Sequence, residues 1–162
     1  MKFEGTVIKY GDNVDTDVII PARYLNTSDK KELASHCMED LDTTFSGRVK
    51  QGDIMVAGFN FGCGSSREQA PEIIKALGIQ CVIAKSFARI FFRNSINNGL
   101  LLIEQPTLYD DIKEGDTISV VMNEHVDYNG KTYPIAALPE NLMDIIRAGG
   151  LVKAMRKLNG LD

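Results

Sequence analysis

The middle of the chain alternates short apolar runs with segments of helical periodicity, and this alternation restricts the possible folds more than any other feature. The run at residues 53–57, closed by Gly58, is typical of a buried strand. The next segment carries its isoleucines and a leucine on one helical face and stops at a glycine. The same order then repeats. We therefore predict strands at residues 53–57, 81–84 and 100–103 and helices at residues 68–77 and 86–99, the second capped by Ser86.

Antiparallel hairpins are predicted around these two βα units. Residues 3–8 and 117–122 read as strands, and Asn129-Gly130 is the pair that favours a tight hairpin turn. Pro139 begins a last amphipathic helix, which pauses at Gly149-Gly150 and then resumes. The sequence therefore predicts a mixed α/β domain.

Length and composition restrict the class of protein. A chain of 162 residues, 44% hydrophobic and 25% charged, is expected to form a single globular domain over residues 1–162. The net charge of −4 argues against a nucleic-acid-binding protein, which would carry a basic face. No apolar run approaches the roughly 18 residues that span a bilayer. The first residues lack the apolar core of a secretory signal, so we expect a cytoplasmic protein without membrane association.

The cysteines and histidines are too few and too far apart to build a metal centre. Cys37, Cys63 and Cys81 form no C-x-x-C pair, and only His36 and His125 could join them. We therefore expect no metal and no cofactor on this chain. Cys37 and Cys81 are interpreted as reduced and buried, and both histidines as surface or loop residues; no further role is assigned to the three cysteines.

The most informative segment is the glycine-rich turn at residues 58–68. Ser65-Ser66-Arg67-Glu68 fits the S-x-x-E capping box, which predicts a helix beginning there. A helix N-terminus with free N–H groups favours anions, and Arg67 adds a planar fork that suits a carboxylate or a phosphate. The glycine spacing matches neither a Walker loop nor a dinucleotide fingerprint. The residues predict an anion site; the alternative is a capped helix with a solvated arginine.

Three motifs, in order along the chain, carry a family resemblance. The motif GCGSSRE at residues 62–68, followed by KSFARI at residues 85–90, is similar to the swivelling domain of aconitases. The motif DTDVIIPARYL at residues 15–25 resembles the separate small subunits of isopropylmalate isomerases and their relatives. The motif RAGGL at residues 147–151, running into an amphipathic helix, also resembles the family. The resemblance covers nearly the whole chain.

This resemblance implies a fold, a reaction and a partner. The implied fold is a swivelling β/β/α domain, as in the aconitase C-terminal domain. The implied reaction is that of a two-chain hydro-lyase of leucine biosynthesis, which interconverts 2-isopropylmalate and 3-isopropylmalate by dehydration and rehydration. The implied partner is a large subunit that carries a 4Fe–4S cluster, so this chain would be active only in the heteromer.

The resemblance also implies roles for individual residues. Ser65 matches the family's general base, which acts as an alkoxide on the carbon-bound proton. Ser66 and Arg67 match its substrate-binding serine and arginine, and Thr16 and Asp17 match an active-site threonine–aspartate pair.

Three nearby charged residues receive no such role. We interpret Asp15 as a local turn cap. Arg89 and Arg93 are interpreted as structural, because their helix follows a core strand and no family role maps to them.

The loop Tyr24-Leu25-Asn26-Thr27 resembles the family's specificity element. An arginine after the Tyr-Leu pair accompanies substrates with a third carboxylate, and apolar residues accompany an isopropyl group. Asn26 fits neither pattern, because an amide supplies no counter-charge to a carboxylate. Isopropylmalate is the predicted substrate; methylmalate, dimethylmalate and homoaconitate are the alternatives. A carboxylate-binding module without catalysis is the alternative outside enzymes.

Overall fold

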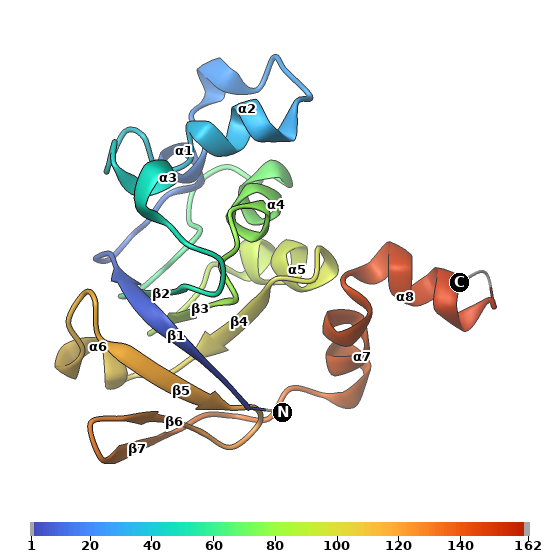
Figure 1. Ribbon diagram of the computed structural model, residues 1–162. Helices are drawn as coiled ribbons and strands as arrows, with labels where there is room; N and C mark the ends of the chain where they lie inside the picture. The colour runs from blue at the N-terminus through green and yellow to red at the C-terminus, as the bar shows by residue number, and fades with distance from the viewer. Residues whose placement is uncertain (1, 161–162) are drawn as a thin grey trace.

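The computed structural model describes residues 2–160, and a single seven-stranded sheet organises them (Figure 1). Its strands are β1 (Lys2–Lys9), β2 (Ile54–Ala57), β3 (Cys81–Ala84), β4 (Leu101–Glu104), β5 (Thr117–Val121), β6 (His125–Tyr128) and β7 (Lys131–Pro134). They lie in the order β4-β3-β2-β1-β5-β6-β7. The half from β4 to β1 is parallel, and β5, β6 and β7 continue from β1 as antiparallel hairpins.

The helices are short and distributed around the parallel half. They are α1 (Thr16–Ile19), the 3-10 turn η1 (Ala22–Tyr24), α2 (Lys30–Ser35), α3 (Phe45–Arg48), α4 (Gln69–Ala76), α5 (Arg89–Asn97), α6 (Leu108–Asp111), α7 (Glu140–Ala148) and α8 (Leu151–Leu158). In Figure 1, α1, α2 and α3 lie together beside α4, and α7 and α8 lie on the outer side of α5.

Alternate residues of the parallel strands enter two separate cores. Met55 and Val82 pack with the helices α2, α4 and α5, whereas Val56 and Ile83 pack on the opposite face with residues of β5, β6 and β7. The sheet is curled, so its antiparallel half covers the second face of its parallel half. The layers are therefore β, β and α, and the predicted α/β class with a swivelling β/β/α architecture is confirmed.

Several predicted elements are confirmed with shifts of one to three residues. The hairpin turn lies at Asn129 and Gly130, whose φ values of +50° and +80° suit this tight turn. The C-terminal helix is divided where predicted, because Gly149 ends α7 with φ +91°. Cys37 and Cys81 are buried and form no disulfide, and burial raises the pKa of both thiols.

The two predicted helix caps are wrong. Helix α4 begins at Gln69 with Glu68 as its N-cap, and no side chain caps it, so Ser65 and Glu68 do not form a capping box. Helix α5 begins at Arg89, three residues after Ser86. The Ser86 Oγ instead accepts a hydrogen bond of 2.8 Å from the backbone N–H of Asn60 and so holds the glycine-rich turn.

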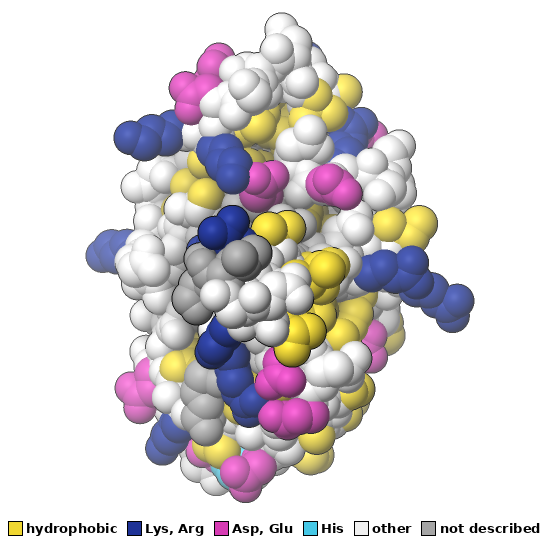
Figure 2. Space-filling model, turned by 90° about the vertical axis from the view of Figure 1, so that its right-hand side faces the viewer, with side chains coloured by type: hydrophobic (Ala, Val, Ile, Leu, Met, Phe, Trp, Pro, Cys, Tyr) yellow, Lys and Arg dark blue, Asp and Glu magenta, His cyan; other side chains and the backbone are white. Residues whose placement is uncertain are grey.

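Helix α8 is the least buried element of the described chain. Its apolar side chains Val152, Met155 and Leu158 are 73%, 54% and 86% exposed. Figure 2 views the molecule from this side and shows hydrophobic side chains gathered on the surface. No helix within residues 2–160 is both long and apolar enough to cross a membrane.

Candidate functional site

The site is built where two loops pair at the carboxyl ends of β1 and β2. The segment after β1, residues 12–16, runs along the glycine-rich turn at residues 58–65. Its backbone bonds join Asn13 N to Phe59 O (2.8 Å), Gly62 N to Val14 O (2.7 Å) and Thr16 N to Cys63 O (2.9 Å). The two loops therefore hold each other in a fixed register, although 49 residues separate Thr16 from Ser65 along the chain.

Two glycines make this close approach possible. Gly62 has φ +82°, and a Cβ there would lie 2.1 Å from the ring of Phe91. Gly64 has φ +89°, and a Cβ there would lie 2.6 Å from a carboxylate oxygen of Asp15. Any other residue would strain the backbone and clash at both positions. Asp15 itself caps α1, since its side chain accepts a bond of 2.7 Å from the N–H of Asp17, and the predicted turn-capping role is confirmed.

Thr16 fixes the backbone of the predicted base. Its side chain is buried, and its Oγ1 donates a hydrogen bond of 2.5 Å to the carbonyl oxygen of Ser65. The Ser65 side chain is exposed, and within the described part of the chain nothing hydrogen-bonds to its hydroxyl. Thr16 thus holds the backbone of Ser65, while the Ser65 hydroxyl stays exposed.

Arg67 carries the strongest sign of a missing ligand. Its side chain is only 13% exposed, and its Nη2 forms an ion pair with the carboxylate of Asp17. Its Nε and Nη1 are buried and have no hydrogen-bond partner in the structure. Buried donors without partners are rare and costly, so these two nitrogens are expected to bind an acceptor that residues 2–160 do not supply.

The Arg67 guanidinium lines a cavity of about 220 Å³. Its polar side chains are Thr16, Ser66, Arg67, Arg89 and Asn94, and residues 62, 64, 88, 90 and 91 complete the walls. The Ser66 Oγ accepts a bond of 3.4 Å from Asn94 Nδ2, which orients the serine along one wall. Of the predicted site residues, Thr16, Ser66 and Arg67 therefore meet here; Asp17 acts through Arg67, and Ser65 stands next to the cavity without lining it.

The helix that faces this cavity is α5. We predicted that the anion site would use the N-terminus of the helix at residues 68–77, but α4 begins beyond Arg67. Residues 88–91, the N-cap and first turn of α5, line the cavity instead, and no side chain caps this helix. The first N–H groups of a helix have no acceptor within it and carry a partial positive charge, so α5 adds to the attraction for an anion.

Two residues that line the cavity were not predicted as part of the site. Arg89, interpreted as structural, has an exposed side chain at the cavity that makes no hydrogen bond or ion pair within residues 2–160. Asn94 was missed altogether. It lies one helical turn after Ile90, and a correct start for α5 would have placed both on the cavity side.

The predicted specificity loop lies against a different cavity. Leu25, Asn26 and Thr27 line a cavity of about 510 Å³ together with Ser28, Lys30, Leu33, Gln69 and Glu72. Tyr24 turns away from it and stacks on the His36 ring, with centroids 3.7 Å apart. The structure therefore does not bring this loop into the Arg67 cavity, although Gln69 lies only two residues after Arg67.

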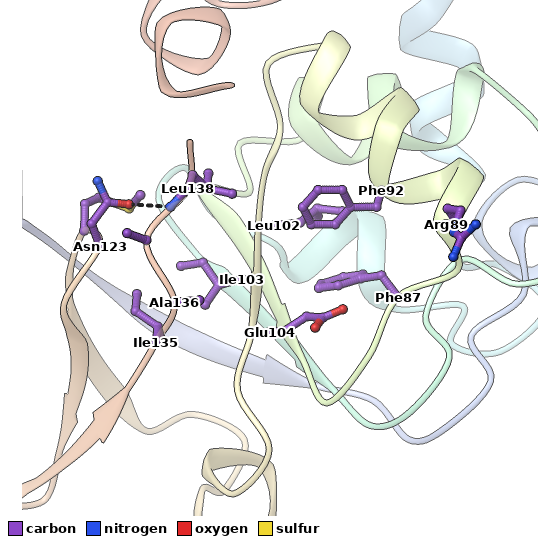
Figure 3. A pocket seen from close by; sticks show the side chains of 12 residues that line it. Phe87, Arg89, Phe92, Leu102, Ile103, Glu104, Asn123, Ile135, Ala136 and Leu138 are labelled. Atoms are coloured by element: carbon purple, nitrogen blue, oxygen red, sulfur yellow. Dashed lines mark hydrogen bonds between the residues drawn. The ribbon is translucent and has the colours of Figure 1, made fainter. Parts of the chain in front are cut away.

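A third cavity, of about 350 Å³, is mainly apolar and shares Arg89 with the Arg67 cavity. It lies between the start of α5, strand β4 and the segment 135–138 (Figure 3). The aromatic rings of Phe87 and Phe92 form one side, and Leu102 and Ile103 form its floor.

The described residues contain no group of three or more histidine, cysteine, aspartate or glutamate side chains that could hold a metal ion. Cys63, which lies in the glycine-rich turn, is half-buried, and burial and the nearby Asp15 carboxylate raise the pKa of its thiol. Both effects disfavour the thiolate form of Cys63.

The fold and the glycine-rich turn agree with one known class of domain, the aconitase C-terminal domain. The sequence pattern of that family matches residues 3–108 of this chain. The domain class predicted from the motifs is thereby confirmed.

Similar proteins show to which family within this class of domain the chain belongs. A 3-isopropylmalate dehydratase small subunit of Lachnospira eligens is 63% identical over 99% of this chain and 98% of its own length. A 3-isopropylmalate dehydratase small subunit of Caldanaerobacter subterraneus subsp. tengcongensis is 57% identical over 95% of this chain and 98% of its own length. The crystal structure of a 3-isopropylmalate dehydratase of Methanocaldococcus jannaschii superposes with a TM-score of 0.92 at 49% identity, covering 98% of this chain and 96% of that one. This chain belongs to the family of 3-isopropylmalate dehydratase small subunits.

Proposed function

We propose that this chain is the small subunit of a hydro-lyase that interconverts 2-isopropylmalate and 3-isopropylmalate. The observation that carries the proposal is Arg67, whose two buried N–H groups lack an acceptor beside the exposed hydroxyl of Ser65. Near-complete alignment with relatives named for this reaction supports it. Elimination of water leaves an unsaturated dicarboxylate, and readdition to the other carbon gives the isomer.

The proposed roles in binding follow from the contacts of each side chain. Arg67 and Ser66 bind one substrate carboxylate, to which the guanidinium donates a charge-assisted hydrogen bond from a nitrogen that Asp17 leaves free. Asp17 holds the far side of that guanidinium through its ion pair and so fixes its plane. Thr16 keeps Ser65 in place through the bond to its carbonyl oxygen.

Ser65 is the proposed base that takes the proton from carbon. A serine hydroxyl is a weak base, and no histidine or lysine touches it in the described chain. The positive charge of Arg67 and the N-terminus of α5 lie at the adjacent cavity and favour the alkoxide form. The substrate completes this environment when it excludes water.

The proposed partner is a large subunit that carries the 4Fe–4S cluster. Such a cluster supplies a Lewis acid for the departing hydroxide. The cysteines of this chain do not suit it, because Cys37 and Cys81 are buried in the two different cores and Cys63 is a single half-buried thiol. This chain therefore contributes the base and the carboxylate site, and the partner contributes the metal.

Substrate choice stays assigned to the loop Tyr24–Thr27. Asn26 is exposed and makes no hydrogen bond in the structure, so it is free to contact a substrate or a partner chain. Its amide favours neither a third carboxylate nor an aliphatic group, and methylmalate, dimethylmalate and homoaconitate remain the alternatives to isopropylmalate.

The division of labour is tested by anaerobic reconstitution. The isolated chain should neither turn over isopropylmalate nor retain stoichiometric iron, whereas the complex with a cluster-bearing large subunit should show both. Turnover by the isolated chain, or stoichiometric iron in it, would contradict the proposal. Isopropylmalate binding by the chain alone, with no turnover in the complex, would favour a carboxylate-binding module instead.

A further inference from the structure

We infer that Arg89 binds the second carboxylate of the substrate, an inference that rests on the proposed function. The substrate is a dicarboxylate, and Arg67 with Ser66 accounts for only one of its two charges. A second carboxylate held without a counter-charge would carry a large desolvation penalty. The chain must therefore offer another cation, or the partner must supply it.

Arg89 meets the requirements of such a cation. It lines the same cavity as Arg67 and stands at the first position of α5, where the helix dipole also favours an anion. Its side chain is exposed and forms no ion pair or hydrogen bond with any described residue. Arg89 lines both the Arg67 cavity and the apolar cavity. Glu104 is the only carboxylate among the described residues that line them, and Arg89 and Glu104 form no ion pair.

Arg89 stands where the Arg67 cavity and the apolar cavity meet. Figure 3 shows it beside Phe87 at the edge of the apolar cavity, with Phe92 and Leu102 further in. A carboxylate on Arg89 therefore lies between a polar cavity and an apolar one. Lys85, a cation on the loop just before α5, cannot take this role freely, because Asp110 binds its ammonium at 2.8 Å.

The test uses the complex with the large subunit and the series Arg89→Lys, Arg89→Gln and Arg89→Glu. Affinity for 2-isopropylmalate, measured by titration calorimetry and as KM, should fall in that order. Loss of one charged hydrogen-bonding partner predicts about a 10- to 100-fold weaker Kd for Arg89→Gln. The matched control is Arg93→Gln on the same helix, an exposed arginine that lines neither cavity. It should leave Kd and KM unchanged.

The outcomes separate the two proposals. An unchanged Kd in Arg89→Gln and Arg89→Glu, with normal binding by the wild type, would overturn the role of Arg89 alone. If Arg93→Gln lowers the affinity as much as Arg89→Gln does, the role of Arg89 is also overturned. The loss of affinity would then come from the general surface charge. Absence of both binding and turnover in the wild-type complex would overturn the proposed function, and the role of Arg89 with it.

Discussion

The loop at residues 58–67 and the loop at residues 24–29 both carry predicted site residues, but they are held in different ways. The first is tied along its length to residues 12–16 and needs glycine at two positions. The second is held at its ends, by the stack of Tyr24 on His36 and by Asp29, which caps α2. Between those ends Asn26 is exposed and makes no hydrogen bond with any residue that the structure describes.

This difference assigns the two loops to different tasks. A base and a carboxylate-binding arginine must be positioned to within fractions of an ångström, which only a tightly bonded backbone provides. A loop that contacts the variable part of a substrate can accept different side chains, because its backbone depends on few of them. The chemistry is therefore expected at residues 58–67 and the selectivity at residues 24–29.

Gly62→Ala should weaken the rigid loop most. The new Cβ would meet the Phe91 ring in a left-handed backbone conformation, so we expect a loss of about 2–5 kcal/mol in the free energy of unfolding, measured in urea. Gly115→Ala is the matched control, since Gly115 also has a positive φ but no neighbour within 4 Å. It should cost only about 1–2 kcal/mol. Equal losses would show that loop packing contributes nothing.

Asp42→Ala should weaken the segment between α2 and α3, which follows the other loop along the chain. Asp42 accepts bonds from Tyr10 (2.8 Å) and Arg48 (2.6 Å) and so ties the segment after the loop at residues 24–29 to the end of β1. Its side chain is 19% exposed, and loss of its charged bonds should cost about 2–3 kcal/mol by urea unfolding. Asp40→Ala is the control, since Asp40 pairs with Arg23 at the exposed surface and its loss should leave the free energy of unfolding nearly unchanged.

The same carboxylate predicts a pH dependence. Burial acts to raise the pKa of Asp42, but bonds from Thr44, Arg48 and Tyr10 outweigh it and hold that pKa well below its usual range. A lowered folded-state pKa stabilises the fold above the unfolded value of about 4, and this contribution is lost as the pH falls further. Unfolding of the wild type should therefore become easier below about pH 4, and Asp42→Ala should show a shallower decline. Parallel pH profiles would contradict this role.

Arg67→Lys should weaken substrate binding while the fold stays intact. An ammonium keeps the ion pair with Asp17 but cannot reproduce the planar fork. We expect KM for isopropylmalate in the complex to rise about tenfold, or ~1.5 kcal/mol, with a smaller change in kcat. A kcat loss larger than the KM effect would instead place Arg67 in the chemical step.

Asn26 should give the smallest and most graded effect. Asn26→Val should raise kcat/KM for isopropylmalate relative to methylmalate by about 1 kcal/mol or more, the range that a fitted methyl group contributes. Asn26→Arg should shift preference toward homoaconitate, whose extra carboxylate needs a counter-charge. The same large subunit must be used throughout. If the wild type and both variants rank the three substrates identically, selectivity lies in the large subunit.

Local sequence patterns predicted most strands and the longer helices, because each of these elements has its own pattern of apolar and turn-forming residues. The strand at residues 81–84 and the Asn129-Gly130 turn were placed correctly from apolar runs and turn chemistry alone. The short helices α1, α2, α3 and α6 were not predicted, since four to six residues are too few for helical periodicity. That residues 1–162 form one domain stays a prediction.

The candidate site was predicted only in part, because its geometry depends on contacts between distant residues. Thr16, Ser66 and Arg67 came from motifs, and the structure brings them to one cavity. The pairing of residues 12–16 with residues 58–65 has no local signal, so the support of Ser65 by Thr16 could not be seen. Arg89 was interpreted as structural because its helix follows a core strand and no family role maps to it, and only the structure places it at this cavity.

The comparison of kcat for Ser65→Ala and Ser66→Ala in the reconstituted complex tests the central claim most directly. If Ser65 is the base, Ser65→Ala should lower kcat by about 10²–10⁴-fold or more, with an unchanged free energy of unfolding and unchanged assembly with the large subunit. Ser66→Ala should act mainly on KM, since Ser66 lines the cavity beside Arg67. A near-normal kcat in Ser65→Ala would contradict the account and would reduce Ser65 to a backbone position that Thr16 happens to hold.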